Sequence, residues 1–393
     1  MWNWYGSPTV TNCIFTSNSA EFGGGLFNYA GSPTVSNCTF SDNSAGDGGG
    51  IYNKNSSSTT VANCTFTDNT TTYYGGGMCN DFSNPIVNDC NFTGNLADAG
   101  GGMRTFYGSP RVINCNFRSN TARHGWGGGM WNTDGNPTVT NCTFSENSAF
   151  SNGGGIEIGG GCILSVTNCS FTGNSSNNSG GGMSNGGNGW TVTNCTFICN
   201  SANDYGGGMN NGRNSTVTNC TFINNSANYG GGMSNWGDST VTNCILWGDE
   251  PDEIYNYSST DTFAYSDVQG GWGDPNDPNN TNIDTDPCFV DGNNPDPNLW
   301  NLRLKPDSPC IDAGDTTTVP GGTWADIGGN PRVLDDPQTP DTGVSLSGLT
   351  VDIGAYEFYC SGFHGDNNCD GVVDFKDLAI LCGNWLAGTE PEL

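Results

Sequence analysis

The chain has 393 residues, of which 61 are glycine, 39 are acidic and 10 are Lys or Arg, so its formal net charge is −29. This excess of acid argues against nucleic acid or an anionic membrane surface as a partner, because phosphate binding needs clustered Lys and Arg. No apolar run is long enough to cross a bilayer, so we expect no membrane span.

The acidic residues divide the chain into three segments. They are sparse before residue 245 and dense from Asp249 to Asp377, which gives boundaries at 1–248, 249–359 and 360–393. Met1 opens directly on the first repeat, without the basic and apolar stretch of a signal peptide. We therefore expect an export signal and further N-terminal residues upstream of Met1.

Residues 1–248 contain a repeat of the form Val-x-Asn-Cys-x-Phe-x-x-Asn, followed after a variable stretch by Gly-Gly-Gly and an apolar residue. The cysteine of the motif recurs every 24 to 27 residues, at Cys13, Cys38, Cys64, Cys90, Cys115, Cys142, Cys169, Cys195, Cys220 and Cys244. Self-similarity at such a period indicates a solenoid, in which each repeat stacks on the next.

Each repeat has the pattern of short strands rather than of a helix. Cys and Phe are two positions apart and so point to the same side of a strand, while Val lies three positions before Cys and requires a bend at the intervening Asn. Asn tolerates the left-handed conformation that such a bend needs. Three short strands per repeat predict an all-β, right-handed parallel β-helix of about ten rungs, with inward columns of Val, Cys, Phe and Met or Ile. Asn side chains at the corners are expected to bond to their equivalents in the next rung.

These repeats resemble those of bacterial polymorphic outer membrane proteins, which are defined by Phe-x-x-Asn and Gly-Gly-apolar. They also resemble the wider class of right-handed β-helix repeat proteins. The resemblance covers residues 7 to 247 and implies a secreted or cell-surface β-helix, without implying a specific partner.

Ten of the 18 cysteines occupy one inward position of the repeat. We interpret them as a column of free thiols that act as small apolar side chains, because parallel Cβ vectors are poorly directed for bridging. Disulfides are expected instead at Cys288 and Cys310, or among Cys360, Cys369 and Cys382.

Residues 249–359 are loop-rich and carry the segments Asp286–Phe289, Ser308–Gly314 and Asp352–Glu357. They resemble the choice-of-anchor module of exported bacterial β-helix proteins. We expect this region to cover the open end of the solenoid, where strand edges would otherwise pair with other chains. A direct part in ligand or calcium binding is the alternative.

Residues 360–393 contain a calcium-loop pattern. Oxygen-bearing side chains fall at positions 1, 3, 5, 9 and 12 of a loop with glycine at position 6, and position 7 adds a backbone carbonyl. The predicted Ca²⁺ ligands are Asp366, Asn368, Asp370, Val372, Asp374 and Asp377. The loop and the apolar stripe after it resemble a single type I dockerin repeat, which implies calcium binding and, in whole dockerins with two repeats, a cohesin-like partner.

A cationic patch on the solenoid is a candidate ligand surface for a sugar acid, with an ordinary solvated surface as the alternative. The cations of the repeats are concentrated near its middle, beside two tryptophans, and they include three arginines expected at outward or turn positions of one face. The surface comprises Arg104, Arg111, Arg118, Arg123, His124, Trp126 and Trp131. Further aromatic residues cluster around the Gly triplets. Stacked over rungs they would form a strip suited to sugar rings, and ordinary packing of the loops against the coil is the alternative.

Two functions follow from these features. The first is a non-catalytic scaffold or adhesin-like protein that binds a polysaccharide or a cell-surface protein. The second is a polysaccharide lyase or glycoside hydrolase, since such enzymes use the parallel β-helix. No paired-carboxylate signature is visible in the repeats, which favours the scaffold.

Overall fold

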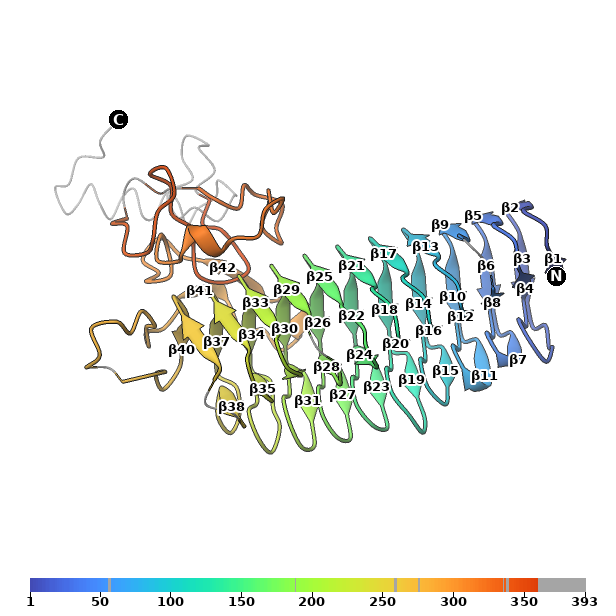
Figure 1. Ribbon diagram of the computed structural model, residues 1–393, viewed down its shortest axis with the longest axis horizontal. Helices are drawn as coiled ribbons and strands as arrows, with labels where there is room; N and C mark the ends of the chain where they lie inside the picture. The colour runs from blue at the N-terminus through green and yellow to red at the C-terminus, as the bar shows by residue number, and fades with distance from the viewer. Residues whose placement is uncertain are drawn as a thin grey trace.

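The computed structural model describes residues 1–55, 58–187, 189–257, 260–274, 276–334, 336 and 339–359. The predicted calcium loop, the apolar stripe after it and Cys360, Cys369 and Cys382 lie outside these residues. Figure 1 shows a rod of stacked rungs that starts at the N-terminus, with the region after residue 289 lying beside the last rungs.

Four parallel sheets run along the rod, and every neighbouring pair of strands in them is parallel. We call them sheets A to D, and in the described residues A, B and C have eleven strands each. Sheet A contains β1 (Trp2–Trp4), β4 (Leu26–Tyr29), β8 (Ile51–Lys54), β12 (Met78–Asp81), β16 (Met103–Phe106), β20 (Met130–Thr133), β24 (Ile156–Gly159), β28 (Met183–Asn185), β32 (Met209–Asn211), β35 (Met233–Asn235) and β38 (Ile254–Asn256).

Sheets B and C carry the two halves of the Val-x-Asn-Cys-x-Phe motif. Sheet B contains β2 (Thr9–Thr11), β5 (Thr34–Ser36), β9 (Thr60–Ala62), β13 (Ile86–Asn88), β17 (Arg111–Ile113), β21 (Thr138–Thr140), β25 (Ser165–Thr167), β29 (Thr191–Thr193), β33 (Thr216–Thr218), β36 (Thr240–Thr242) and β39 (Thr262–Ala264). Sheet C contains β3 (Ile14–Thr16), β6 (Thr39–Ser41), β10 (Thr65–Thr67), β14 (Asn91–Thr93), β18 (Asn116–Arg118), β22 (Thr143–Ser145), β26 (Ser170–Thr172), β30 (Thr196–Ile198), β34 (Thr221–Ile223), β37 (Ile245–Trp247) and β40 (Asp267–Val268).

Sheet D adds a fourth strand to seven rungs of the described residues, and the sequence did not predict it. It contains β7 (Ser44–Asp47), β11 (Thr70–Tyr74), β15 (Leu96–Ala97), β19 (Thr121–Ala122), β23 (Ser148–Ala149), β27 (Ser175–Ser176) and β31 (Ser201–Ala202). These strands follow the Asn of each repeat and are mostly two residues long. They are too short to show the alternation of apolar and polar residues by which a strand is recognised in sequence. The loops after them project along one edge of the rod (Figure 1).

The solenoid also extends past residue 248. An additional rung, β38 to β40, pairs with the tenth although it has lost the motif. In this rung Phe263 continues the Val column and the Ser266 hydroxyl accepts from the Cys244 backbone N–H at 3.1 Å, in the place of a cysteine sulfur.

The predicted bend between sheets B and C is confirmed. The residue before each motif cysteine has a positive φ, for example 54° at Asn12 and 53° at Asn141.

The Gly triplets are needed for a different reason from the Asn bends. Gly127 has a φ of 65°, and a Cβ on Gly129 would lie 2.6 Å from the Gly155 carbonyl oxygen and 3.0 Å from the Phe144 ring. The triplet is therefore required by close approach of neighbouring rungs.

The inward columns are confirmed as one continuous apolar core. The phenylalanine column from Phe15 to Phe222 is a stack of near-parallel rings, with centroids 4.6–5.0 Å apart. Burying one such side chain stabilises the fold by roughly 1.5–3 kcal/mol relative to leaving it exposed. The motif cysteines are free thiols, all buried except Cys13. Cys288 and Cys310 are free as well, so the disulfide expected there is wrong.

The Asn of Phe-x-x-Asn forms a buried polar ladder beside this core. From Asn18 to Asn225, each amide donates from Nδ2 to the Oδ1 of the next rung at 2.8–3.0 Å, and Asp249 accepts from the last of them. Each Asn from Asn43 onward also donates to the carbonyl oxygen of a Phe in the preceding rung.

The C-terminal region is not the simple end cap that we expected. Trp272 packs on Phe263 and Ile283 bridges to β40, so the segment just after the last rung covers the end. Residues from β41 (Phe289–Asp291) and β42 (Asn301–Leu304) onward instead lie against the side of the rod. They also include two short 3₁₀ helices, Pro297–Leu299 and Thr316–Thr318.

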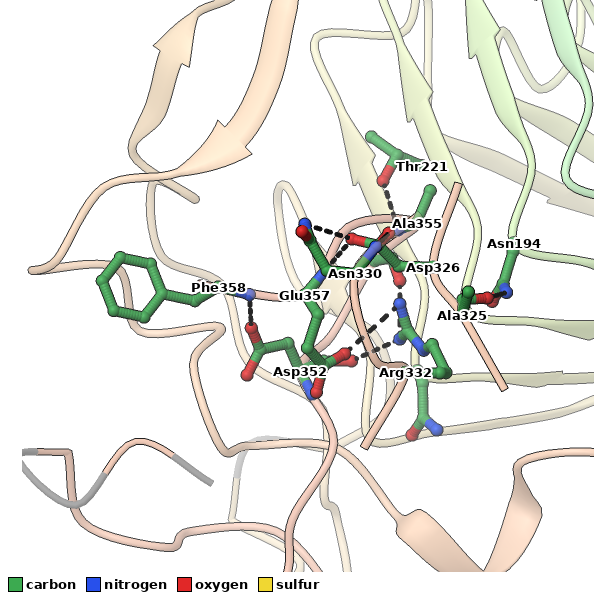
Figure 2. Close-up of polar contacts among 12 residues, drawn as sticks. Asn194, Thr221, Ala325, Asp326, Asn330, Arg332, Asp352, Ala355, Glu357 and Phe358 are labelled. Atoms are coloured by element: carbon green, nitrogen blue, oxygen red, sulfur yellow. Dashed lines mark hydrogen bonds and ion pairs between the residues drawn. The ribbon is translucent and has the colours of Figure 1, made fainter. Parts of the chain in front are cut away.

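The cause of this side docking is an apolar patch on the outer face of sheet C. Ile198, Ile223 and Ile245 face outward and are buried by Leu302, Leu304 and their neighbours. Polar contacts add to the patch, because the Thr221 hydroxyl accepts from the Ala355 N–H at 3.0 Å and Asn194 donates to the Ala325 carbonyl at 2.8 Å (Figure 2).

Candidate functional site

The predicted ligand surface is split between faces of the rod. Arg104 lies on β16 of sheet A, Arg111 on β17 of sheet B and Arg118 on β18 of sheet C, while Arg123 and His124 follow β19. The expectation that the three arginines share a face is therefore wrong. Residues seven apart have passed a corner of the rung, so their side chains leave the rod in different directions.

Most of these cations are paired with acids. Arg118 contacts Glu146 at 3.1 Å, and both side chains are about half exposed, so the pair contributes at most about 1 kcal/mol. Asp98 accepts from His124 Nδ1 at 2.9 Å and lies 3.3 Å from Arg123 Nη2. Arg123 Nη2 also donates to the Thr71 carbonyl at 2.7 Å. These contacts tie loops to neighbouring rungs, which is a structural role.

Arg104 is buried on the outer face of sheet A. Its Nη1 pairs with Asp81 of the preceding rung. Its guanidinium carbon lies 4.6 Å from the Tyr74 ring centroid, 4.7 Å from Phe106 and 5.4 Å from Trp131, which are distances for cation–π contact. The Trp126 ring centroid lies 5.4 Å from that of Trp131. Of the residues predicted for the ligand surface, the structure thus brings together on this face only Arg104, Trp126 and Trp131.

Two acids beside Arg104 were not predicted as site residues. Asp81 accepts from the Tyr52 hydroxyl at 2.7 Å as well as from Arg104. Asp47 lies close enough to Asp81 that burial, and then the charge of Asp81, raise the pKa of Asp47. Burial and the Asp81 contact also raise the pKa of Tyr52 above its ordinary value, so the phenol stays protonated. The cluster holds a fixed cation among rings, with two carboxyl groups beside it.

Aromatic side chains line sheet A and the loops beside it in three groups along the rod. We call them together the sheet A aromatic face. It comprises Trp2, Trp4, Tyr5, Phe27 and Tyr29, then Tyr73, Tyr74, Phe106, Trp126 and Trp131, then Tyr205, Tyr229, Trp236, Tyr255 and Tyr257. Several of these rings are more than half exposed, including Trp2, Trp4, Tyr73 and Tyr257.

The third group borders a groove of about 460 Å³. Trp236 and Tyr257 stack there with ring centroids 4.9 Å apart, and Trp236 Nε1 donates to Asn210 at 2.8 Å. Arg213 lines the same groove and is exposed. The arrangement presents a ring platform, amide groups and a cation to solvent.

Glu157 is the buried acid of sheet A. It stands in register between Trp131 and Ser184, and its Oε2 has no hydrogen-bond partner among the described residues. Burial raises the pKa of Glu157 to about 8, which a hydrogen bond from Ser184 offsets only in part. Near neutral pH this environment therefore favours the protonated carboxyl.

The part of the chain that the structure describes contains no group of three or more His, Cys, Asp and Glu side chains with a metal-binding arrangement. None of its helices has the length and apolarity of a bilayer crossing.

The comparison with protein families agrees with this fold. A family described as "Right handed beta helix region" matches residues 4–144 and 111–267, which together are more than half of the chain. The chain therefore belongs to the right-handed β-helix family. No curated protein sequence matches it.

Sequence reasoning missed the acids at Arg104 and the docking patch for different reasons. Asp47, Asp81 and Arg104 are spaced like ordinary polar positions, and only the register of the rungs brings them together. The patch has a visible signal, because Thr-Phe-Ile replaces the usual Thr-Phe-Thr or Thr-Phe-Ser at Ile198 and Ile223.

Glu157 predicts a pH dependence of stability. Its pKa is raised from an ordinary 4.5 in the unfolded chain to about 8 in the folded protein. The folded state therefore holds a proton that the unfolded state loses, and stability is lost as the pH rises from the unfolded to the folded pKa. Glu157→Gln removes this loss, so the variant should gain in melting temperature over the wild type as pH rises from about 5 to about 8. Thermal unfolding across this range tests it, and a difference that does not change with pH contradicts it.

Proposed function

We propose that this protein is a secreted or cell-surface, non-catalytic β-helix scaffold that binds glycan along the sheet A aromatic face. The observation that carries the proposal is the stack of the half-buried Trp236 on the exposed Tyr257, over a groove that also holds Asn210 and Arg213. Sugar rings offer an apolar face to an aromatic ring and hydroxyls to amides and cations.

The remainder of the chain supports this proposal over a role in binding charged polymers. With a net charge of −29, the protein repels nucleic acid, whereas a neutral glycan is indifferent to that charge. The acidic, well-solvated composition and the resemblance of the repeats to surface proteins support an extracellular site. The alternative ligand of the aromatic face is a protein, since exposed aromatic rings also anchor protein partners.

Tyr257→Ala should weaken binding to a soluble polysaccharide by roughly tenfold, because one stacked ring contributes about 1.4 kcal/mol. The ring is 68% exposed, so its removal should leave the melting temperature unchanged. Affinity gel electrophoresis against xylan, galactomannan, mixed-linkage glucan and polygalacturonate measures the effect. Phe150→Ala, which removes an exposed ring from the edge of the rod, is the matched control. Equal retention of wild type and Tyr257→Ala would remove the aromatic face from the proposal.

A polysaccharide lyase or hydrolase is the second candidate, and Glu157 is the observation that favours it. A carboxyl that stays protonated at neutral pH suits a general acid. Glu157 is nevertheless 5% exposed, and the scaffold proposal expects no turnover. The same polysaccharides, assayed for reducing ends and for unsaturated uronate absorbance, test this. Turnover that Glu157→Gln abolishes would replace the scaffold by an enzyme.

We also propose that residues 366–377 bind Ca²⁺, on the spacing of their oxygen ligands. Calorimetric titration of the full chain should show heat of binding at or below millimolar calcium, and Asp370→Ala should abolish it by removing the position 5 ligand. Asp277→Ala, an exposed acid of a turn in the second segment, makes the same change of charge and should bind like the wild type. A wild-type chain that gives no heat with millimolar calcium would rule the site out.

A further inference from the structure

A groove of about 500 Å³ lies between sheet B and the loop 320–325 of the C-terminal region. Its floor comes from strands β21, β25 and β29, and its wall from the segment Pro320–Ala325. The groove exists because the C-terminal region docks on the side of the rod rather than on its end.

The lining of this groove carries no ionisable side chain. Hydroxyl groups come from threonine and serine, amides from asparagine, and one ring from Trp324. The lining residues are Thr140, Asn141, Ser165, Thr167, Asn168, Thr191, Thr193, Pro320, Gly321, Gly322, Thr323, Trp324 and Ala325. In a chain with 39 acidic and 10 basic residues, a wholly uncharged lining excludes recognition by ion pairing.

Trp324 is 85% exposed, although its backbone is held in place. Its carbonyl oxygen accepts from the Arg332 N–H at 3.1 Å, and Ala325 forms a bridge with Pro331. The Ala325 carbonyl in turn accepts from Asn194 of the solenoid (Figure 2). The Trp324 ring is thus held at a fixed place in solvent. A ligand that covered the ring would be stabilised by burial of its apolar surface.

Arg332 fixes this loop from below. Its side chain is buried, pairs with Glu357 at 3.4 Å, and donates from Nη2 to the Asp352 and Gly354 carbonyls at 2.9 Å. Figure 2 shows Arg332 beside the Ala325–Asn194 contact. The wall of the groove is therefore built on the core of the C-terminal region.

The solenoid side of the groove is equally fixed. Thr140, Thr167 and Thr193 stand in register on neighbouring strands, as do Ser165 and Thr191. Neighbouring parallel strands are about 4.8 Å apart, so hydroxyls recur along the rod at a spacing comparable with the length of one sugar residue in a chain. Asn141 and Asn168 add amides at the adjoining corner.

We propose that this groove binds a neutral oligosaccharide, with one sugar ring stacked on Trp324 and its hydroxyls bonded to the Thr and Asn side chains of sheet B. This site is separate from the sheet A aromatic face and goes beyond the function proposed above. A phosphorylated or uronate ligand does not fit, because no cation lines the groove.

Affinity electrophoresis of the full chain in gels that contain xylan, galactomannan or mixed-linkage glucan tests the site. At least one of these neutral polymers should retard the wild type, and Trp324→Ala should weaken that retention roughly tenfold. Trp324→Phe should keep part of it. Thr167→Val changes only a hydroxyl on the solenoid side and should weaken retention severalfold, which tests the groove independently of the loop.

Phe150→Ala and thermal unfolding of every variant control for folding. Retardation by none of the three polymers, or equal retention of wild type and Trp324→Ala, would overturn the proposal. Retention that is lost in Tyr257→Ala but kept in Trp324→Ala would also overturn it, while leaving the function proposed for the sheet A aromatic face intact.

Discussion

The hydrogen bond from one ladder asparagine to the next is the interaction on which this structure depends. A buried amide side chain must satisfy two donors and an acceptor, and here each Asn does so only if the next rung is in register. Asn147, for example, donates to Asn174 and to the Phe117 carbonyl, and accepts from the Asn120 backbone and side chain. A rung displaced by one residue leaves all of these groups unpaired in the apolar core.

The ladder also explains how the solenoid ends. Asp249 takes the place of the next Asn, and its Oδ1 accepts from the backbone N–H and from Nδ2 of Asn225. The backbone N–H of Asp249 donates to Glu253 at 3.2 Å. Burial, and then the neighbouring Glu253, raise the pKa of Asp249. The carboxyl of Asp249 supplies an acceptor oxygen for Asn225 at the point where the next rung has no ladder asparagine. Trp272 then packs on Phe263 of the rung that follows.

Because the ladder fixes register, the outward positions form columns that are free to carry other chemistry. On sheet A they carry rings and the Arg104 cluster, and on sheet B they carry mostly hydroxyls. On the last strands of sheet C they carry isoleucines, which dock the C-terminal region and so create the groove below Trp324. Proposed binding sites thus arise from outward residues on a scaffold that inward residues specify.

The inward half of the structure follows from sequence because it repeats. The Val, Cys and Phe columns, the bend at Asn12 and its equivalents, and the parallel coil all depend on spacing within one repeat. The outward half does not repeat, and its partners are about 25 residues apart in sequence. Arg104 and Asp81 come into contact only through the register of sheet A. Trp324 and Thr167 line the same groove only because the C-terminal region docks on the side of the rod, which no sequence pattern predicts. The two-residue strands of sheet D are too short to give a pattern.

The most direct test of this account is the stability of Asn147→Ala against Ser145→Ala, measured as the midpoint of denaturant unfolding. Asn147 is fully buried in the ladder, whereas Ser145 is a partly exposed outward residue of the same repeat. The ladder predicts that Asn147→Ala leaves several buried polar groups unpaired and costs about 3 kcal/mol or more, while Ser145→Ala changes stability by at most about 0.5 kcal/mol. Similar midpoints for the two variants would contradict the claim that the ladder holds the rungs in register.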